Sequence, residues 1–495
     1  MSGRQQVIFG REYPQSVDAV VIGSGIGGLV CANLLARGGM KVLLVERHHT
    51  LGGFCSTFRR KGFVFDAATH FYPLLGNPAT MTGKLLAELE IPTQWIKMDP
   101  IDRFHLPGMP VFEVPADFAG YIRKLKDWFP DEAVALEQYF GDLRQAYLCG
   151  LLYYFKGIPN KGAQRLENFT IQQKLDESFR DPRLKTILLA DSAHWGSLPD
   201  RTSYLFDAML RMAYFEGNYY PRGGSQEFAD DLGRSLEARG GKILKCASAE
   251  RILIADGKVT GVRVRTVSRR EPETFDFAAP VVVSNADAIH TFRDLVGEQH
   301  CGRSFLDGLQ ASTPTLPCFL THIGLKGADP AELAAAAGYY WASLDPSDVA
   351  KDVFKVFIPT EYDPRVAPPG CQILIVQKLT PVQFDSTDWA AHKAEVEAAI
   401  MERLREILPG IDRQIVVKAS ATAMTSYRFT GNWQGAMLGW EMSPGHLGGS
   451  RLSNITAIEN LYLAGHWTRP GGGITPVIVS AQLTAGRILG EVTKR

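Results

Sequence analysis

The hydrophobic pattern changes several times within the first 46 residues. A short apolar run, VDAVVI, predicts a buried strand over 17–22, and a cluster of glycines follows it. Apolar residues then recur at helical spacing, which predicts a helix that ends at Gly38 and Gly39. A second apolar run, KVLLVE, predicts another strand, which ends at Glu46. The order is therefore strand, glycine turn, helix, strand and acid.

The uncharged run over 19–36 suggests a membrane span as an alternative. Four glycines, at 23, 25, 27 and 28, fall within six positions of this run. Glycine weakens helices, and a span of this length would be richer in leucine. The flanking strands decide between the two interpretations in favour of a nucleotide-binding turn.

Gly23, Gly25 and Gly28 match the GxGxxG pattern of a dinucleotide-binding βαβ unit. The first glycine allows the tight turn, the second lets the backbone approach a diphosphate, and the third lets the helix pack against the sheet. Glu46 follows the last glycine by 18 residues, near the spacing expected for an acid that binds ribose hydroxyls. The alternative is a glycine-rich turn that binds nothing.

The remaining pattern predicts a mixed α/β chain. A PRGG turn at 221–224 precedes a helix and a strand, and Asp256 with Gly257 predicts a hairpin between two strand-like runs. The run VVVS at 281–284 predicts a further strand, and a glycine-rich loop at 471–473 leads into a closing helix. Within 81–217, the spacing of apolar and aromatic residues predicts helices, which form either ordinary core or the wall of an apolar tunnel.

A second glycine pair, Gly52 and Gly53, follows Glu46 closely, which suits a flavin domain better than an NAD domain. With the residues around it, the chain resembles the phytoene desaturase, carotenoid isomerase and retinol saturase branch of the FAD-dependent amine oxidase superfamily. The residues that carry the closest match are Gly52, Gly53, Cys55, Thr57, Phe58, Gly62, Phe63, Phe65, Asp66 and His70.

This resemblance implies an α/β fold with two lobes. One is a Rossmann-like FAD-binding lobe of the glutathione-reductase and amine-oxidase type, formed by 1–80, 218–300 and 456–495. The other is an α+β substrate lobe, formed by 81–217 and 301–455, whose sheet roofs the flavin.

The cofactor implied is FAD. Ala249 would contact the adenine through its backbone, and the closing helix would face the flavin. The family commonly has aspartate where this chain has His466; the alternative for His466 is a surface histidine stacked on Trp467. The predicted FAD-binding residues are Gly23, Gly25, Gly28, Glu46, Arg47, Gly52, Gly53, Ala249, Gly465, His466, Gly473, Ile474 and Thr475.

Three residues are candidates for roles in catalysis. The resemblance places His70 on a loop near the flavin, where it could shuttle protons, and a purely structural histidine is the alternative. Trp433 and Trp440 lie in a loop that lines the cavity in related enzymes, where they could stack on a polyene or on the flavin edge. Packing beneath a long loop is the alternative for both tryptophans.

The composition argues against several other classes of function. Lys plus Arg and Asp plus Glu are both 53, so no basic excess points to nucleic acid. Seven scattered cysteines without a CxxC pair indicate reduced thiols in a cytoplasmic setting, and no metal-binding or hydrolase motif is evident. The N-terminal residues lack the apolar run of a signal peptide.

The favoured function is an FAD-dependent oxidoreductase that desaturates, isomerises or saturates a long apolar polyene. A flavin amine oxidase is one alternative, and a flavin-free lipid-binding protein similar to Rab GDP-dissociation inhibitors is another. Because such polyenes reside in bilayers, we expect peripheral membrane contact. The sequence predicts no oligomeric state.

Overall fold

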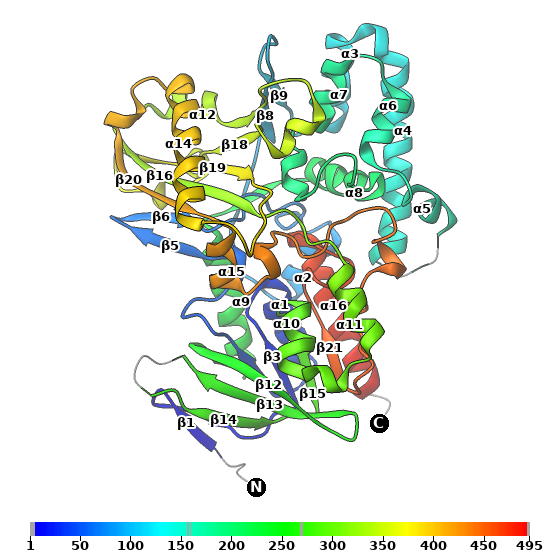
Figure 1. The fold of residues 1–495 in the computed structure, drawn as a ribbon, viewed down its shortest axis with the longest axis vertical. Coiled ribbons are helices and arrows are strands. Elements are labelled where there is room, and N and C mark those ends of the chain that lie inside the picture. Colours follow the sequence, from blue (N-terminus) through cyan, green and yellow to red (C-terminus); the bar gives the residue numbers. More distant parts are fainter. Residues whose placement is uncertain (1–4, 156–157, 159, 268–270, 493–495) are drawn as a thin grey trace.

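The computed structural model describes residues 5–155, 158, 160–267 and 271–492, which fold into two lobes (Figure 1). Both ends of the chain lie in the lower lobe of this view, which contains the predicted nucleotide unit. The upper lobe contains a larger sheet and most of the helices. The predicted fold class is confirmed.

The lower lobe is built on a five-stranded sheet in which every neighbouring pair is parallel. Its strands come from four separate parts of the chain, and nearly all of their side chains are buried. A strand covered on both faces reads as a continuous apolar run, which is why the sequence pattern revealed these strands. The order is β11 (Lys242–Leu244), β4 (Val42–Val45), β3 (Ala19–Ile22), β15 (Val281–Ser284) and β21 (Leu461–Leu463).

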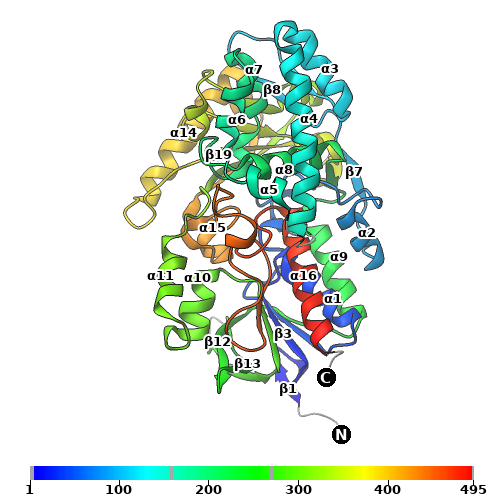
Figure 2. The same cartoon turned by 90° about the vertical axis from the view of Figure 1, so that its right-hand side faces the viewer.

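Helices cover one face of this sheet and an antiparallel layer covers the other. On the helical face, α1 (Ile26–Arg37) lies between α9 (Ser225–Ala238) and α16 (Ile474–Val492) (Figure 2). The opposite layer is made of β12 (Ala247–Ala255), β13 (Lys258–Thr266), β14 (Thr274–Ala278), α10 (Ala288–His290), η5 (Thr291–Gly297), η6 (Glu298–His300) and α11 (Arg303–Ala311).

The predicted hairpin joins β12 to β13. Asp256 and Gly257 have φ of 50° and 74°, the left-handed pair that a tight two-residue turn requires. The predicted domain boundaries stay a prediction. The helix α2 (Met81–Glu88), placed by that prediction in the substrate lobe, has Leu85 and Leu86 in the core beneath the parallel sheet.

The upper lobe contains a seven-stranded mixed sheet. Its two faces pack against different helices, because side chains alternate along each strand. Leu374 packs toward α12 (Pro330–Ala336) and α14 (Trp389–Ile407), whereas Ile373 packs into the large core on the other face. The strand order is β20 (Ile415–Ala421), β16 (Cys318–Lys326), β19 (Cys371–Leu379), β18 (Phe354–Phe357), β17 (Gly338–Tyr340), β8 (Asp102–His105) and β9 (Phe112–Val114).

A group of helices completes the upper lobe, in agreement with the helices that the apolar spacing within 81–217 predicts. Several begin at a residue whose side chain accepts a hydrogen bond from the first turn, among them Asp117, Thr170 and Ser203. The helices are α3 (Phe118–Trp128), α4 (Ala133–Gly150), η3 (Leu151–Phe155), α5 (Lys161–Leu166), α6 (Ile171–Ser178), α7 (Pro182–Leu189), η4 (Ser192–Trp195) and α8 (Tyr204–Phe215).

Short elements connect the lobes or lie at their edges. The strands are β1 (Gln5–Ile8), β2 (Arg11–Pro14), β5 (Thr57–Arg60), β6 (Phe63–Asp66), β7 (Trp95–Lys97) and β10 (Tyr219–Pro221). The helical turns are η1 (Gly53–Cys55), η2 (Pro130–Glu132), η7 (Pro346–Ala350), α13 (Pro359–Tyr362), η8 (Pro364–Val366), η9 (Ile411–Arg413), α15 (Ala423–Thr430), η10 (Trp433–Gly435) and η11 (Gly448–Ser450).

Candidate functional site

A long cavity joins the two lobes. It begins along the carboxyl ends of β3, β4 and β15, the edge where open parallel sheets bind ligands. We call this part the groove; its lining includes 22–27, 45–47, 52–55, 247–249, 285–287 and 472–477. The second part, the limb, runs under the seven-stranded sheet and is lined by Phe71, Tyr147, Leu151, Tyr154, His194, Phe206, Met209, Leu210, Ala213, Tyr214, Cys318, Leu320, Gln377, Met437, Leu438, Met442 and Leu447.

The glycine turn at the start of α1 leaves no room for side chains. A Cβ placed on Gly28 would lie 2.1 Å from the carbonyl oxygen of Gly23, which itself has φ of 91°. Gly25 is the N-cap of α1, and no side chain caps the free N–H groups of the first turn. An uncapped helix N-terminus beside a groove is suited to bind a diphosphate. Gly28 supports the turn by packing and does not itself line the cavity.

Glu46 lies at the end of β4 and lines the groove. Its carboxylate accepts hydrogen bonds from the Ser24 backbone at 2.8 Å, the Ser24 hydroxyl at 2.6 Å and the His48 backbone at 2.7 Å. These donors fix the carboxylate at the edge of the groove, the position expected for a contact with ribose. The neighbouring Arg47 donates to the carbonyl of Arg428 at 3.0 Å, so it ties the end of α15 to the groove.

Asn285 is a groove residue that the sequence analysis missed. It directly follows β15, and its side chain occupies the space between three glycines. A Cβ would lie 2.8 Å from Asn285 Nδ2 if placed on Gly25, and 2.7 Å and 2.5 Å from Asn285 Oδ1 if placed on Gly27 and Gly465. Its position at the carboxyl end of a parallel strand could have been a signal, but only once β15 was known to pair with β3.

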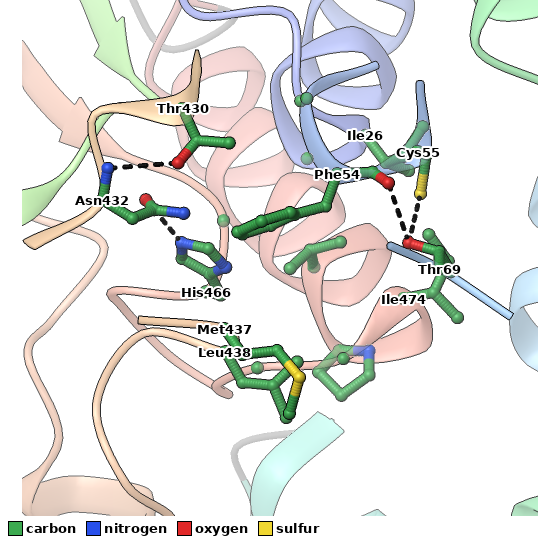
Figure 3. Close-up of a pocket in the computed structure, with 18 of the residues that line it drawn as sticks. Ile26, Phe54, Cys55, Thr69, Thr430, Asn432, Met437, Leu438, His466 and Ile474 are labelled. Carbon is green, nitrogen blue, oxygen red and sulfur yellow. Dashed lines mark hydrogen bonds between the residues drawn. The ribbon is translucent and has the colours of Figure 1, made fainter. Parts of the chain in front are cut away.

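The C-terminal loop forms the wall opposite Phe54 (Figure 3). His466 lines the cavity, and its Nε2 atom lies 3.2 Å from Asn432 Oδ1, which also accepts a hydrogen bond from the Trp467 indole. The His466 ring meets Trp467 edge-on at 82°, so the histidine is not stacked on it at the surface. Burial, with the nearby charge of Arg451, lowers the pKa of His466 to about 3, which keeps the imidazole neutral.

Arg451 holds this wall in place. Its buried guanidinium donates to the carbonyls of Trp440 at 3.1 Å, Glu441 at 3.3 Å, His466 at 2.8 Å and Thr468 at 3.2 Å. Among the described residues no carboxylate forms an ion pair with it, so carbonyl oxygens alone satisfy the charge. Burial lowers its pKa to about 9.

The other predicted FAD-binding residues all line the groove or its junction with the limb. Thr475 donates its hydroxyl to the carbonyl of Pro73 at 2.8 Å, which anchors the start of α16. The lining residues are Gly52, Gly53, Ala249, Gly473, Ile474 and Thr475.

The three predicted catalytic residues have different positions. His70 lines the cavity, and neither of its buried ring nitrogens has a hydrogen-bond partner. Neither tryptophan lines the cavity. Trp440 is fully buried in the core of the lower lobe against Trp467, at 4.6 Å between ring centres, and Trp433 donates its backbone N–H to Asp287. The structure therefore does not bring the tryptophans to the predicted stacking position.

The limb is suited to an uncharged, apolar ligand. Among the described residues that line the cavity, Glu46 and Asp287 are the only acids and Arg47 is the only Lys or Arg, and all three lie in the groove. One face of α8 supplies lining residues such as Phe206 and Leu210, while its opposite face packs into the core. The aromatic stretch thus forms both core and tunnel wall.

The sequence matches the family described as flavin-containing amine oxidoreductases over residues 26–489. The chain belongs to this family. The glycine turn, the uncapped helix and Glu46 fit the adenine dinucleotide of FAD, so the protein is an FAD-dependent oxidoreductase. The same features argue against the flavin-free lipid carrier.

Two curated relatives are similar over most of their length. One is the all-trans-retinol 13,14-reductase of Danio rerio, 27% identical over 519 residues that cover 93% of this chain and 84% of the relative. The other is the chloroplastic prolycopene isomerase of Arabidopsis thaliana, 26% identical over 510 residues that cover 96% of this chain and 83% of the relative.

Solved structures share the fold. An oxidoreductase from Methanosarcina mazei has a TM-score of 0.65 with 19% identity, and the match covers 95% of this chain and 100% of that one. Cyclohexylamine oxidase from Brevibacterium oxydans has a TM-score of 0.62 with 16% identity, and the match covers 96% of this chain and 99% of that one.

Proposed function

We propose that this protein is an FAD-dependent oxidoreductase that acts on a long apolar polyene bound in the limb. The observation that carries the proposal is the continuity of the cavity. A groove that fits FAD opens into a limb whose lining, within the described part of the chain, bears no acid, lysine or arginine. The names of the two relatives, a retinol reductase and a prolycopene isomerase, support a polyene as the ligand.

An amine substrate is less favoured. An ammonium group needs a carboxylate or a pair of aromatic rings to replace its hydration. The cavity wall beside the C-terminal glycine loop is instead formed by Met437, Leu438 and Pro470, and the two acids of the cavity lie in the groove. Among the described residues no carboxylate lines the limb, so an ammonium group would find no counter-charge there.

FAD, when bound, accepts or donates a hydride, and the protein supplies the arrangement around it. The N-terminus of α1 and Glu46 hold the dinucleotide, and the limb excludes water and aligns the polyene. His70 directly follows Thr69, and both residues line the cavity; the unpartnered ring nitrogens of His70 could take up or release a proton there. Desaturation, isomerisation and saturation all require this arrangement.

The test is to incubate the purified yellow holoenzyme with cis and trans polyenes, with the flavin either oxidised or chemically reduced. We expect conversion only with reduced flavin. An unchanged product mass identifies isomerisation, and a gain of two hydrogens identifies saturation. Loss of two hydrogens with oxidised flavin identifies desaturation, which also supports a polyene oxidoreductase. A holoenzyme that oxidises amines and converts no polyene would overturn the proposal.

We further propose that the protein contacts membranes peripherally, near the limb. Within the described residues no helix is long and apolar enough to cross a bilayer. Leu148, Leu152 and Ile158 are about half exposed, and Ile158 hydrogen-bonds to the backbone of Leu152. We call these three residues the leucine patch. Tyr147 and Leu151, on the same helical segment, line the limb, so the patch adjoins the cavity wall.

A further inference from the structure

The limb is mostly apolar; besides Tyr147, Tyr154 and Gln377 in its wall, it has a group of polar rings next to the loop that carries His70. We call His70, His194 and Tyr214 the polar cluster; all three line the cavity. Phe71 lies beside this cluster, with its ring 4.6 Å from that of His194 and edge-on to it. The hydroxyl of Thr69 donates to the carbonyl of the groove residue Phe54 at 3.2 Å, so the chain immediately before His70 is tied to the groove.

The polar cluster has unused hydrogen-bonding capacity. His70 is 3% exposed, and its Nδ1 and Nε2 atoms both lack a partner. Nδ1 of His194 lies 3.5 Å from the hydroxyl of Tyr214, and among the described contacts its Nε2 atom has none. Buried polar atoms are rarely left unpaired in native proteins, so two unpaired nitrogens on a residue that lines a cavity point to a ligand with matching groups.

The electrostatics of the polar cluster select an uncharged group. Burial and the charge of Lys355 hold the pKa of both histidines well below the usual value, so both rings are neutral at neutral pH. Lys355 itself is buried, forms an ion pair with Asp102 at 2.5 Å and does not line the cavity. A carboxylate would therefore find no free cation in the limb, whereas a neutral imidazole can both donate and accept.

We propose that His70 and His194 bind an uncharged oxygen group, a hydroxyl or a carbonyl, at one end of the polyene. The inference rests on the proposed function and narrows it to an oxygenated substrate. It also places the double bonds next to the oxygenated end closest to the groove, because the polar cluster lies next to the loop that is tied to the groove. A pure hydrocarbon would leave the ring nitrogens unpaired.

The experiment measures binding to the holoenzyme with oxidised flavin and no reductant, so that no turnover occurs. The probes are all-trans-retinol, all-trans-retinoic acid and the hydrocarbon in which hydrogen replaces the hydroxyl of retinol. We expect the dissociation constant of retinol to be roughly tenfold lower than that of the hydrocarbon, the usual scale of a net hydrogen bond. Retinoic acid should bind more weakly than retinol, because its buried carboxylate lacks a cation.

Variants separate the histidines from the general shape of the limb. In His70→Phe and His194→Phe the preference for retinol over the hydrocarbon should disappear, while the hydrocarbon binds as before or more tightly. His70→Gln, which keeps a donor and an acceptor, should restore part of the preference. Phe206→Leu is the matched control, because it changes an apolar lining residue and should affect all three probes alike.

Equal affinity of the wild type for retinol and the hydrocarbon would overturn the inference while leaving the proposed function intact. Loss of bound flavin in His70→Phe, together with an unchanged preference in His194→Phe, would overturn it as well, because the nitrogens of His70 would then serve the cofactor. If none of the probes or longer polyenes bind, the proposed function itself fails.

Discussion

Gly28 has no room for a side chain, because a Cβ there would lie 2.1 Å from a backbone oxygen of the nucleotide turn. We therefore expect Gly28→Ala to push α1 away from the turn. Stability should fall by about 1–3 kcal/mol, the usual effect of overpacking, and the purified protein should lose most of its flavin. Flavin absorbance relative to protein and thermal unfolding measure the two effects.

Gly486→Ala is the matched control. Gly486 lies on the exposed side of α16, with no atom within 4 Å of its added Cβ. This variant should keep its flavin and gain about 0.5–1 kcal/mol, because alanine is the better helix former. If Gly28→Ala kept a full complement of flavin and an unchanged unfolding temperature, the tight packing at the turn would be of no consequence for binding.

Glu441 gives the stability a pH dependence. Its buried carboxylate accepts a hydrogen bond from Arg201 at 2.6 Å, yet burial raises its pKa to about 7. Because the folded pKa lies above the ordinary 4.5, the contribution of this group to stability is fully present below pH 4.5. It is then lost as the pH rises through 7.

Glu441→Gln should remove this loss. At pH 8 the variant should be more stable than the wild type by roughly 2–3 kcal/mol, following 1.36 kcal/mol for each unit of pKa shift. At pH 5 the difference should shrink to below about 1 kcal/mol. Urea unfolding at the two pH values measures both differences. A difference of the same size at pH 5 and pH 8 would show that the carboxylate does not titrate in this range.

At the scale of elements, the segment formed by α4 and η3 has two apolar sides. Tyr147 and Leu151 line the limb, whereas Leu148 and Leu152 are exposed at 55% and 43%. If the exposed side contacts a bilayer, replacing both leucines with serine should weaken binding to phospholipid vesicles at least tenfold. The expectation follows from about 1.5–3 kcal/mol for each buried leucine. Flotation with vesicles measures the bound fraction.

Val134→Ser provides the control on the same helix. Val134 is 70% exposed, but it lies 14 residues before Leu148, which is about 21 Å along a helix. The substitution should leave vesicle binding unchanged. Equal losses in both variants would indicate a general effect of surface polarity and would argue against the leucine patch as the contact.

The sequence predicts local elements, but it does not predict which distant strands pair with each other. The glycine turn, the strand that ends before Glu46 and the hairpin at Asp256 depend on residues close together in the chain, and the described turn, strands and hairpin confirm them. The contact of Glu46 with ribose stays a prediction. Asn285 reaches the groove only because β15 pairs with β3, some 260 residues apart in sequence. Local patterning carries no information about such pairings.

Side-chain direction was equally beyond prediction. Trp440 lies in the loop that the resemblance placed at the cavity, but packing against Trp467 turns its ring into the core of the lower lobe. His466 faces the cavity, although its neighbour Trp467 is buried. Within α8, the apolar spacing predicted the helix, but only tertiary packing decides which face lines the limb.

At the scale of the whole molecule, the groove gathers segments that are far apart in the chain. Residues 22–27, 247–249, 285–287 and 472–477 all line it, so a bound dinucleotide contacts each of them. A ligand that binds only the folded state stabilises that state by about 2.7 kcal/mol when it is present at 100 times its dissociation constant. Removing FAD should therefore lower the unfolding temperature by several degrees.

Calorimetry of holoenzyme and flavin-stripped protein measures this difference, and added FAD should restore it in proportion to the logarithm of its concentration. Riboflavin at the same concentrations is the informative control. It has the ring system but lacks the diphosphate and adenosine that α1 and Glu46 are placed to hold. We expect riboflavin to produce little shift. A shift as large as that of FAD would mean that the ring alone provides the affinity, and the glycine turn would lose its assigned role.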